Sequence, residues 1–425
     1  MTASGLISRI PGSHPALRSR NFRLFIVGQL ISYTGSWLQT VAQGWLVLQL
    51  SNSAFIVGLV TALGSMPILL FTLYGGVLAD RVNRRKTVMI LQALLAVEAL
   101  ALAILVVLNH VTVGWIMGLA LFTGLVTAFE VPIRQAMVAE LSGRESLMNA
   151  IALQSSVFNL ARVLGPAFAG AIIGIWGVAA CFFLNAASFF AVIWGLWRMD
   201  LPDTPAAKGR VDVIGAFKEG ARYVRHERWP RALMILIAST TIFGFSFLAM
   251  LPVFARDVLA ADAGGYGVLV SSVGVGALSG ALFLAGFGGT LRKRRLALIS
   301  AVGFGMALLA TAFAPNYWVA LGLLAVVGCS MVLQSISANT LLQQEAPDHL
   351  RGRVMGFYSF VVLGMAPFGA LQIGWISQHL GTRVAFGLGG TVCVVAAIYV
   401  WRRIVAKPRH EQRERERPPV VEEHP

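Results

Sequence analysis

Long apolar segments alternate with short polar ones along almost the whole chain. A helix needs about 20 mostly apolar residues to cross a bilayer, and windows of about 19 residues reveal such segments. Twelve windows meet this condition, at residues 22–48, 54–78, 87–108, 113–131, 146–174, 179–197, 232–252, 266–289, 296–314, 316–339, 354–376 and 382–403. The pattern therefore predicts an all-α integral membrane protein with twelve transmembrane helices.

Composition supports the membrane assignment and excludes the usual soluble classes. Of the 425 residues, 57% are hydrophobic and 12% are charged, whereas soluble domains carry about 25% charged residues. The 34 Lys and Arg residues outnumber the 19 Asp and Glu residues, but they form short clusters between apolar runs. This distribution favours contact with anionic lipid headgroups and argues against nucleic acid as a partner.

The positions of the basic residues predict the orientation of the chain. If successive loops are assigned to alternate sides, nearly all Lys and Arg residues fall on the side that holds both termini. The other side receives only Arg256 and Arg383, and Arg162 lies inside a span. The positive-inside rule then places both termini in the cytoplasm. Because the composition is rich in Arg and Ala, we expect a multi-pass protein of a bacterial cytoplasmic membrane.

The longest polar segment inside the chain, residues 198–231, divides the spans six and six. The predicted units are a cytoplasmic N-terminus at 1–21, a bundle at 22–197, a linker at 198–231, a second bundle at 232–403 and a disordered tail at 404–425. In the linker, Val213, Phe217, Ala221 and Val224 recur at helical spacing opposite basic residues. This pattern predicts an amphipathic helix on the inner leaflet, or else a solvated linker helix.

The two predicted bundles share sequence features at matching places. Gly76 and the pair Arg84-Arg85 have counterparts in Gly286 and the pair Arg294-Arg295, and Pro166 has one in Pro367. Proline frees a backbone carbonyl, which is tolerated in a membrane helix that is packed or lines a cavity. Paired halves with matched Gly- and Pro-interrupted spans are typical of transporters that rock about a central cavity. The repeat favours a transporter over a channel or a receptor.

The loop after the second span carries a recognisable motif. Residues 75–86 read Gly-Gly-Val-Leu-Ala-Asp-Arg-Val-Asn-Arg-Arg-Lys, which resembles the Gly-x-Leu-Ala-Asp-Arg-x-Gly-Arg-Arg signature of the major facilitator superfamily. Asn83 stands at the second glycine, and asparagine tolerates a left-handed backbone better than most residues. Residues 134–136, 149–152, 162–166 and 350–355 resemble the enterobactin-exporter and macrolide-efflux branch of that superfamily.

The resemblance implies a fold, a mechanism and a set of gating residues. It implies two pseudo-symmetric six-helix bundles around a central cavity, and proton-driven efflux of small organic molecules by alternating access. Asp80, Arg81 and Arg84 would lock the outward-facing state against the start of the eleventh helix, at 352–356. The other predicted gating residues are Gly76, Arg85, Glu130, Arg134, Gly165, Pro166, Arg351 and Arg353.

Four charged residues lie in or beside the spans. Glu98, in the middle of the third span, is either a proton carrier or a protonated acid bonded to a neighbouring helix. Arg162, in the fifth span, cannot deprotonate and therefore needs a substrate anion, a helix carboxylate or a wet cavity. Glu130 and Arg134 are spaced as an exposed helical pair, worth about 0.2–0.5 kcal/mol, with a structural, gating or proton-binding role.

Polar residues of the first span recur every three or four positions and form a broad band. This band predicts a lining of the translocation path, with hydrogen bonding between helices as the alternative. The band consists of Gln29, Ser32, Tyr33, Ser36, Gln39, Thr40 and Gln43, and similar single polar residues on later spans are Gln154, Asn159, Gln334 and Asn339.

Motifs for other chemistry are missing from the sequence. There is no phosphate-binding loop, no close histidine pair and no hydrolase elbow, and the three cysteines lie far apart in apolar runs. We therefore expect no enzyme activity, cofactor or metal, and a monomer that handles small molecules and protons. An uptake transporter of the same fold, or a non-transporting membrane scaffold or sensor, remains the alternative. Arg162 favours an anionic substrate, and the aromatic content favours a bulky apolar one.

Overall fold

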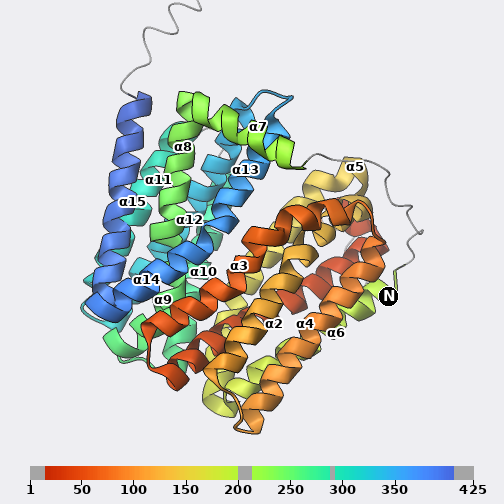
Figure 1. Cartoon of the computed structure of the whole chain (residues 1–425), viewed down its shortest axis with the longest axis vertical. Coiled ribbons are helices and arrows are strands. Elements are labelled where there is room, and N and C mark those ends of the chain that lie inside the picture. Colours follow the sequence, from red (N-terminus) through yellow and green to blue (C-terminus); the bar gives the residue numbers. More distant parts are fainter. Residues whose placement is uncertain (1–14, 200–212, 288–291, 406–425) are drawn as a thin grey trace, which may run out of the picture.

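A computed structural model of the chain describes residues 15–199, 213–287 and 292–405, and all regular structure in these ranges is helical. Figure 1 shows two groups of helices, one running from red to yellow-green and the other from green to blue. Residues 1–14 of the predicted N-terminus, 200–212 of the predicted linker and 406–425 of the predicted tail lie outside the described residues.

The first bundle contains the predicted spans one to six. Its elements are a short 3-10 helix η1 (Pro15–Arg18), α2 (Arg20–Ser51), α3 (Ala54–Ala79), α4 (Arg84–Val107), α5 (Val113–Trp176) and α6 (Val178–Trp197). The backbone of Gly143, with φ of 68°, breaks the helical path of α5. It divides α5 into the fourth span, Val113–Gly143, and the fifth, Ser146–Trp176. Glycine suits this position because it adopts positive φ without a Cβ clash.

The second bundle follows α7 (Val213–His226). The first span of this bundle, the seventh of the chain, consists of four helical segments. Helix α8 (Arg228–Ser239) leads through the π-helical turn η2 (Thr240–Phe245) to α9 (Phe247–Val253), and a second π-helical turn, η3 (Phe254–Val258), follows α9. The remaining helices are α10 (Ala263–Phe287), α11 (Lys293–Ala312), α12 (Tyr317–Glu345), α13 (Arg351–Gly364), α14 (Ala366–Leu380) and α15 (Thr382–Val405).

The predicted twelve-helix, two-bundle fold is confirmed. Eleven spans within the described residues are long and apolar enough to cross a membrane. The first predicted span is not among them, because its polar band lowers its hydropathy. It nevertheless forms the 32-residue helix α2, which packs against α5 and α6 in the first bundle.

Asn83 has a different role from the one expected. Its φ is −69°, so it does not take up the left-handed backbone that its alignment with a family glycine suggested. Its side-chain oxygen instead accepts a hydrogen bond from the backbone N–H of Lys86, at 3.0 Å, and caps the N-terminus of α4. Asparagine is among the best N-cap residues because it satisfies one of the unpaired N–H groups of the first turn.

The helices define two ends of the molecule. The basic end carries the turn between α3 and α4, residue Gly143 and helix α7. The opposite end carries the turn between α2 and α3 and the turn between α5 and α6. Towards the opposite end, both bundles share one hydrophobic core, which includes Trp45 and Val57 of the first bundle and Tyr266 and Ile373 of the second.

At the basic end the cores are separate. One cluster contains only residues of η1 to α6 and the segment just after it, and another contains only residues of α7, the second bundle and the segment between α12 and α13. The bundles are therefore joined at the opposite end and part towards the basic end.

Small residues make the contact between the bundles close. A Cβ atom added to Gly58 of α3 would lie 2.5 Å from the carbonyl oxygen of Ala370 in α14. On α5, Gly170 packs in the same way against Gly264 of α10. Such contacts let helix backbones approach where lipid provides no hydrophobic drive for helix association. The joint between the bundles therefore depends on residues without side chains.

Helix α7 lies across the basic end in Figure 1 and packs against α13. The Phe217 ring lies 5.4 Å from the ring of Phe357 and 5.0 Å from that of Phe360, centroid to centroid. Glu219 pairs with Arg353. The expectation that the apolar face of α7 rests on the inner leaflet is wrong, because a protein helix occupies that face.

Candidate functional site

The loop motif ties together four helices of the first bundle. The Arg84 guanidinium contacts a carboxylate oxygen of Glu140 on α5 at 3.2 Å and one of Asp80 at 3.5 Å, and its Nε donates to the carbonyl oxygen of Ala79 at 3.0 Å. Arg85 donates to the carbonyl oxygen of Trp197, at the end of α6, at 2.8 Å. Arg81 is exposed.

The predicted lock between this motif and the eleventh helix is not formed in this conformation. At the start of that helix, Arg351 binds Asp348 at 2.5 Å, and Arg353 pairs with Glu219 of α7. An added Cβ on Gly76 would meet no atom within 4 Å, whereas one on the adjacent Gly75 would lie 2.5 Å from the carbonyl oxygen of Ala128. Gly75 therefore makes the close helix contact in this state.

Glu130 and Arg134 form a buried ion pair, so the expectation of an exposed pair is wrong. The fourth span continues past Pro132 to Gly143, which places both residues inside the bundle, with 5% and 7% of their surfaces exposed. Arg134 Nε lies 2.7 Å from a carboxylate oxygen of Glu130, and Gln92 of α4 donates to the same oxygen at 3.0 Å. Buried charges are stable only with such partners.

This pair also holds Tyr33 of α2. The second arm of the Arg134 guanidinium donates to the Tyr33 hydroxyl, which lies 3.4 Å from the side-chain nitrogen of Gln154 on the second half of α5. The Tyr33 ring makes an edge contact with Phe158, at 5.4 Å between centroids, and Phe158 also lies 6.4 Å from Trp37. Tyr33 thus joins the charged pair to an aromatic group between α2 and α5.

Arg162 lies one helical turn beyond Phe158 on α5. Its Nη2 donates to the side-chain oxygen of Asn159 at 2.9 Å, and the Asn159 nitrogen donates to the Ser155 carbonyl oxygen at 2.8 Å. The Arg162 Nε atom is buried and has no hydrogen-bond partner, although the side chain as a whole is half-buried. No carboxylate among the described residues lies within ion-pair distance of Arg162.

The predicted pathway residues Tyr33, Gln154, Asn159 and Arg162 are therefore brought together on α2 and α5. Gly165 and Pro166 lie next to them: Gly165 packs against Trp37, and an added Cβ on Gly267 of α10 would clash with the Pro166 carbonyl. Sequence reasoning missed Phe158 and Trp37. Phe158 could have been found, because it lies four residues before Arg162 and therefore on the same helix face.

Glu98 belongs to a different hydrogen-bond network, which is buried between α2, α4 and α6. Gln39 of α2 donates to its two carboxylate oxygens at 3.0 and 3.2 Å, and Asn185 of α6 donates to the Gln39 side-chain oxygen at 2.7 Å. Glu98 is 3% exposed, and no described cation lies within ion-pair distance of it. The interhelical hydrogen bonds considered as the alternative for the polar band are present at Gln39.

The polar band of α2 divides between two environments. Gln29, Ser32 and Gln39 are buried in the first bundle. Tyr33, Ser36 and Gln43 are half-buried, and Thr40 is exposed. The hydroxyls of Ser36 and Thr40 donate to carbonyl oxygens of their own helix, at 2.9 and 2.8 Å, which satisfies them without another helix.

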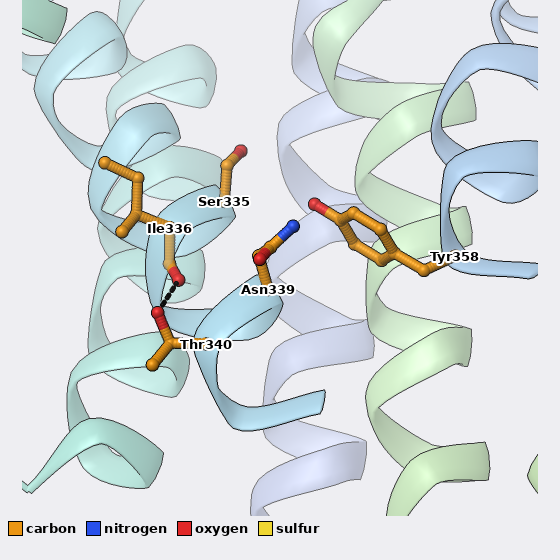
Figure 2. Close-up of a pocket in the computed structure, with 5 residues that line it drawn as sticks. All are labelled: Ser335, Ile336, Asn339, Thr340 and Tyr358. Carbon is orange, nitrogen blue, oxygen red and sulfur yellow. Dashed lines mark hydrogen bonds between the residues drawn. The ribbon is translucent and has the colours of Figure 1, made fainter. Parts of the chain in front are cut away.

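In the second bundle, Gln334 and Asn339 have separate surroundings. Gln334 is buried and donates to the Thr240 hydroxyl at 2.9 Å. Asn339 lines a pocket of about 240 Å³ between α12 and α13, and its side-chain oxygen accepts a bond from Gln343 at 2.6 Å. Figure 2 shows the Asn339 amide nitrogen and the Tyr358 hydroxyl pointing towards each other across this pocket, which is completed by Ser335, Ile336 and Thr340.

Comparisons with known proteins agree with this architecture. A family described as transmembrane secretion effector matches residues 12–423. The multidrug efflux pump Tap of Mycolicibacterium fortuitum is 27% identical and aligns with 85% of this chain and 90% of its own. The staphyloferrin A transporter of Staphylococcus aureus is 24% identical (90% and 96% covered), and the enterobactin exporter EntS of Salmonella typhi is 25% identical (91% of each).

Solved structures share the fold at low sequence identity. A bacterial homolog of the human lysosomal transporter Spinster, in an inward-facing and occupied conformation, has a TM-score of 0.72 at 14% identity and covers 90% of this chain and 96% of its own. The nucleoside transporter NupG has a TM-score of 0.71 at 13% identity and covers 90% and 98%.

Proposed function

This chain belongs to the transmembrane secretion effector family of the major facilitator superfamily and is a membrane transporter rather than an enzyme, and from that premise we propose that it exports small organic molecules by alternating access. Relatives over most of its length are named as a multidrug efflux pump, a staphyloferrin A transporter and an enterobactin exporter. Two of these three names state export, which supports the proposed direction of transport.

The observation that carries the proposal is the separation of the two cores at the basic end. The bundles share one core at the opposite end and part towards the basic end. The positive-inside rule assigns the basic end, with both termini, to the cytoplasm. In this orientation the bundles part towards the cytoplasm, the side from which an exporter loads its substrate.

The coupling ion is a proton, and Glu98 is its carrier. Burial without a cation disfavours the charged form of a carboxyl group, and Glu98 is sealed among neutral partners. Glu130 is a poorer carrier because Arg134 neutralises it at 2.7 Å.

The protein acts as a monomer. Exposed basic side chains of α7, including Lys218, Arg222 and Arg225, lie near anionic lipid headgroups.

An accumulation assay in cells tests export. Cells with the wild type, with Asp80→Asn or with an empty vector are loaded with dyes, macrolides and catecholate siderophores, with and without a protonophore. We expect at least one compound to accumulate less in wild-type cells only, and the protonophore to remove the difference. Higher accumulation in wild-type cells would favour uptake, and no difference for any compound would contradict transport of these classes.

A second assay separates coupling from transport. Glu98→Gln keeps the size and hydrogen-bonding capacity of the side chain but carries no titratable proton. In proteoliposomes, we expect this variant to exchange substrate down its gradient while losing acceleration by an imposed pH gradient. Unchanged acceleration would remove Glu98 from proton coupling and leave export itself intact.

A further inference from the structure

Arg162 is a permanent positive charge at membrane depth, and no described residue is its acidic partner. Arginine stays protonated in proteins, and a buried charge without a counter-charge costs several kcal/mol. Here Asn159 satisfies one N–H, Nε is buried and unpaired, and no described carboxylate is within ion-pair distance. Arg134, which also lies inside a span of the first bundle, differs because Glu130 is 2.7 Å from it.

Arg162 lies at the contact between the two bundles. Close approaches of α5 and α10 include Gly170 against Gly264 and the Arg162 carbonyl, 2.8 Å from an added Cβ on Gly274. The adjacent Val163 carbonyl accepts a bond from Ser271 at 2.9 Å. Towards the basic end the cores of the two bundles are separate. The backbone of Arg162 thus lies at the joint, and its side chain is half-buried.

An apolar surface accompanies the charge on the same helix face. Phe158 precedes Arg162 by four residues, and the residue is 41% exposed although its ring contacts Tyr33 and Trp37. Residues four apart on a helix are neighbours on its surface. Tyr33 is in turn fixed by Arg134 and Gln154. A molecule at this place would meet a guanidinium next to a fixed aromatic wall.

We propose that Arg162 binds the carboxylate of an organic acid whose aromatic or apolar body lies against Phe158 and Trp37. Such acids are then the substrate class of the export proposed above, and this inference rests on that proposal. The guanidinium presents its donors in a planar fork that matches the two oxygens of a carboxylate. Asn159 holds one arm of the fork, at 2.9 Å, and leaves the other arm for the substrate.

Paired probes that differ only in charge test this assignment. The purified full-length protein is titrated by calorimetry with aromatic carboxylates, each paired with its neutral primary amide, starting with coumarin-3-carboxylate and coumarin-3-carboxamide. We expect wild type to prefer the acid. In Arg162→Gln the affinity for the acid falls about 10- to 100-fold, the range expected for hydrogen bonds to a charged group, and the affinity for the amide stays unchanged.

Two further variants separate charge from structure. Arg162→Lys keeps the charge but not the fork, so we expect an intermediate affinity for the acid. Arg383→Gln removes a cation from an exposed position at the opposite end and serves as the matched control that retains wild-type affinity. An equal loss for acid and amide in Arg162→Gln would reveal a purely structural role and overturn the proposal, as would a wild type that prefers no acid of the panel.

Failure of this inference and failure of export give different results. Wild-type transport of neutral compounds without preference for acids would overturn the role of Arg162 and leave export standing. Acid binding that depends on Arg162, in a protein that moves no compound across a membrane, would support the site and contradict export.

Discussion

Gly58 offers a sharp test of the joint between the bundles, because alanine there adds a single methyl group at a backbone contact. The added Cβ would lie 2.5 Å from the Ala370 carbonyl oxygen and 3.0 Å from the Cα atom of Gly374. Neither neighbour is the end of a flexible side chain, so α3 and α14 must separate. Gly174 provides the matched control, since an added Cβ at this other helical glycine meets no atom within 4 Å.

The expected population shift depends on which conformation contains the clash. Overpacking by one methyl group costs about 1–3 kcal/mol. Alanine also favours a helix over glycine by about 0.8–1.0 kcal/mol, but this gain applies to both conformations and cancels. The clash exists only where α3 touches α14, so Gly58→Ala should shift the population away from the state closed at the opposite end by about 5- to 150-fold.

Distances between spin labels report this shift. Labels at Trp115 and Trp318, which are exposed near the opposite end on different bundles, would give pulsed-EPR distances for the two variants and the wild type. We expect a longer-distance population in Gly58→Ala only. If Gly58→Ala gave the same distribution as Gly174→Ala, the reasoning that this contact closes the opposite end would be refuted.

Three further predictions concern single contacts. Arg256→Ala removes hydrogen bonds of 3.2 and 2.9 Å from the second bundle to the Leu48 carbonyl oxygen and the Asn52 side chain. We expect it to weaken closure of the opposite end by about 1–2 kcal/mol. The same spin labels report this change, and an unchanged distance distribution would contradict the prediction. Glu130→Gln leaves Arg134 buried without its counter-charge and should lower the free energy of unfolding by about 3–5 kcal/mol; in denaturation of the purified protein, a double variant with Arg134→Gln should recover part of the loss, and no recovery would argue against the pair. Phe217→Ala removes two ring contacts, each worth about 0.5–1.5 kcal/mol, and should speed amide hydrogen exchange across 213–226; unchanged exchange would show that other contacts hold α7.

Hydropathy predicted the helices well because lipid imposes a length and a composition on each span. The predicted spans 54–78 and 382–403 nearly coincide with α3 and α15. The end of the fourth span was placed too early, since Pro132 and the adjacent charges resemble a helix terminus. The helix continues because Arg134 binds Glu130 and Tyr33 inside the bundle, and Gln92 donates a hydrogen bond to Glu130. A sequence window contains no information about such partners on other helices.

The same limit applies to the candidate site. Gln154, Asn159 and Arg162 were predicted within one span and lie on α5, but spacing could not tell which polar residues of the first span face the bundle interior. Gln39 binds Glu98 and Asn185, while Tyr33, six residues earlier, faces Phe158. For α7 the amphipathic pattern was read correctly and its partner was not, because a lipid surface and an apolar helix satisfy the same pattern.

The π-helical turns of the seventh span have a consequence for insertions and deletions. A π-turn accommodates one more residue than the α-helical turn it replaces, and each residue of an α-helix advances by about 100°. Deletion of one residue within Thr240–Phe245 would therefore turn the wide turn into an ordinary α-helical one and leave α8 and α9 nearly in their present phase. The same deletion in a regular helix would rotate its two ends by that angle. The contacts of Gly244 with Phe304 and Cys393, and of Ser246 with Gly369, lie at or just after this turn. We therefore expect the seventh span to tolerate the loss of one residue here better than a regular span does.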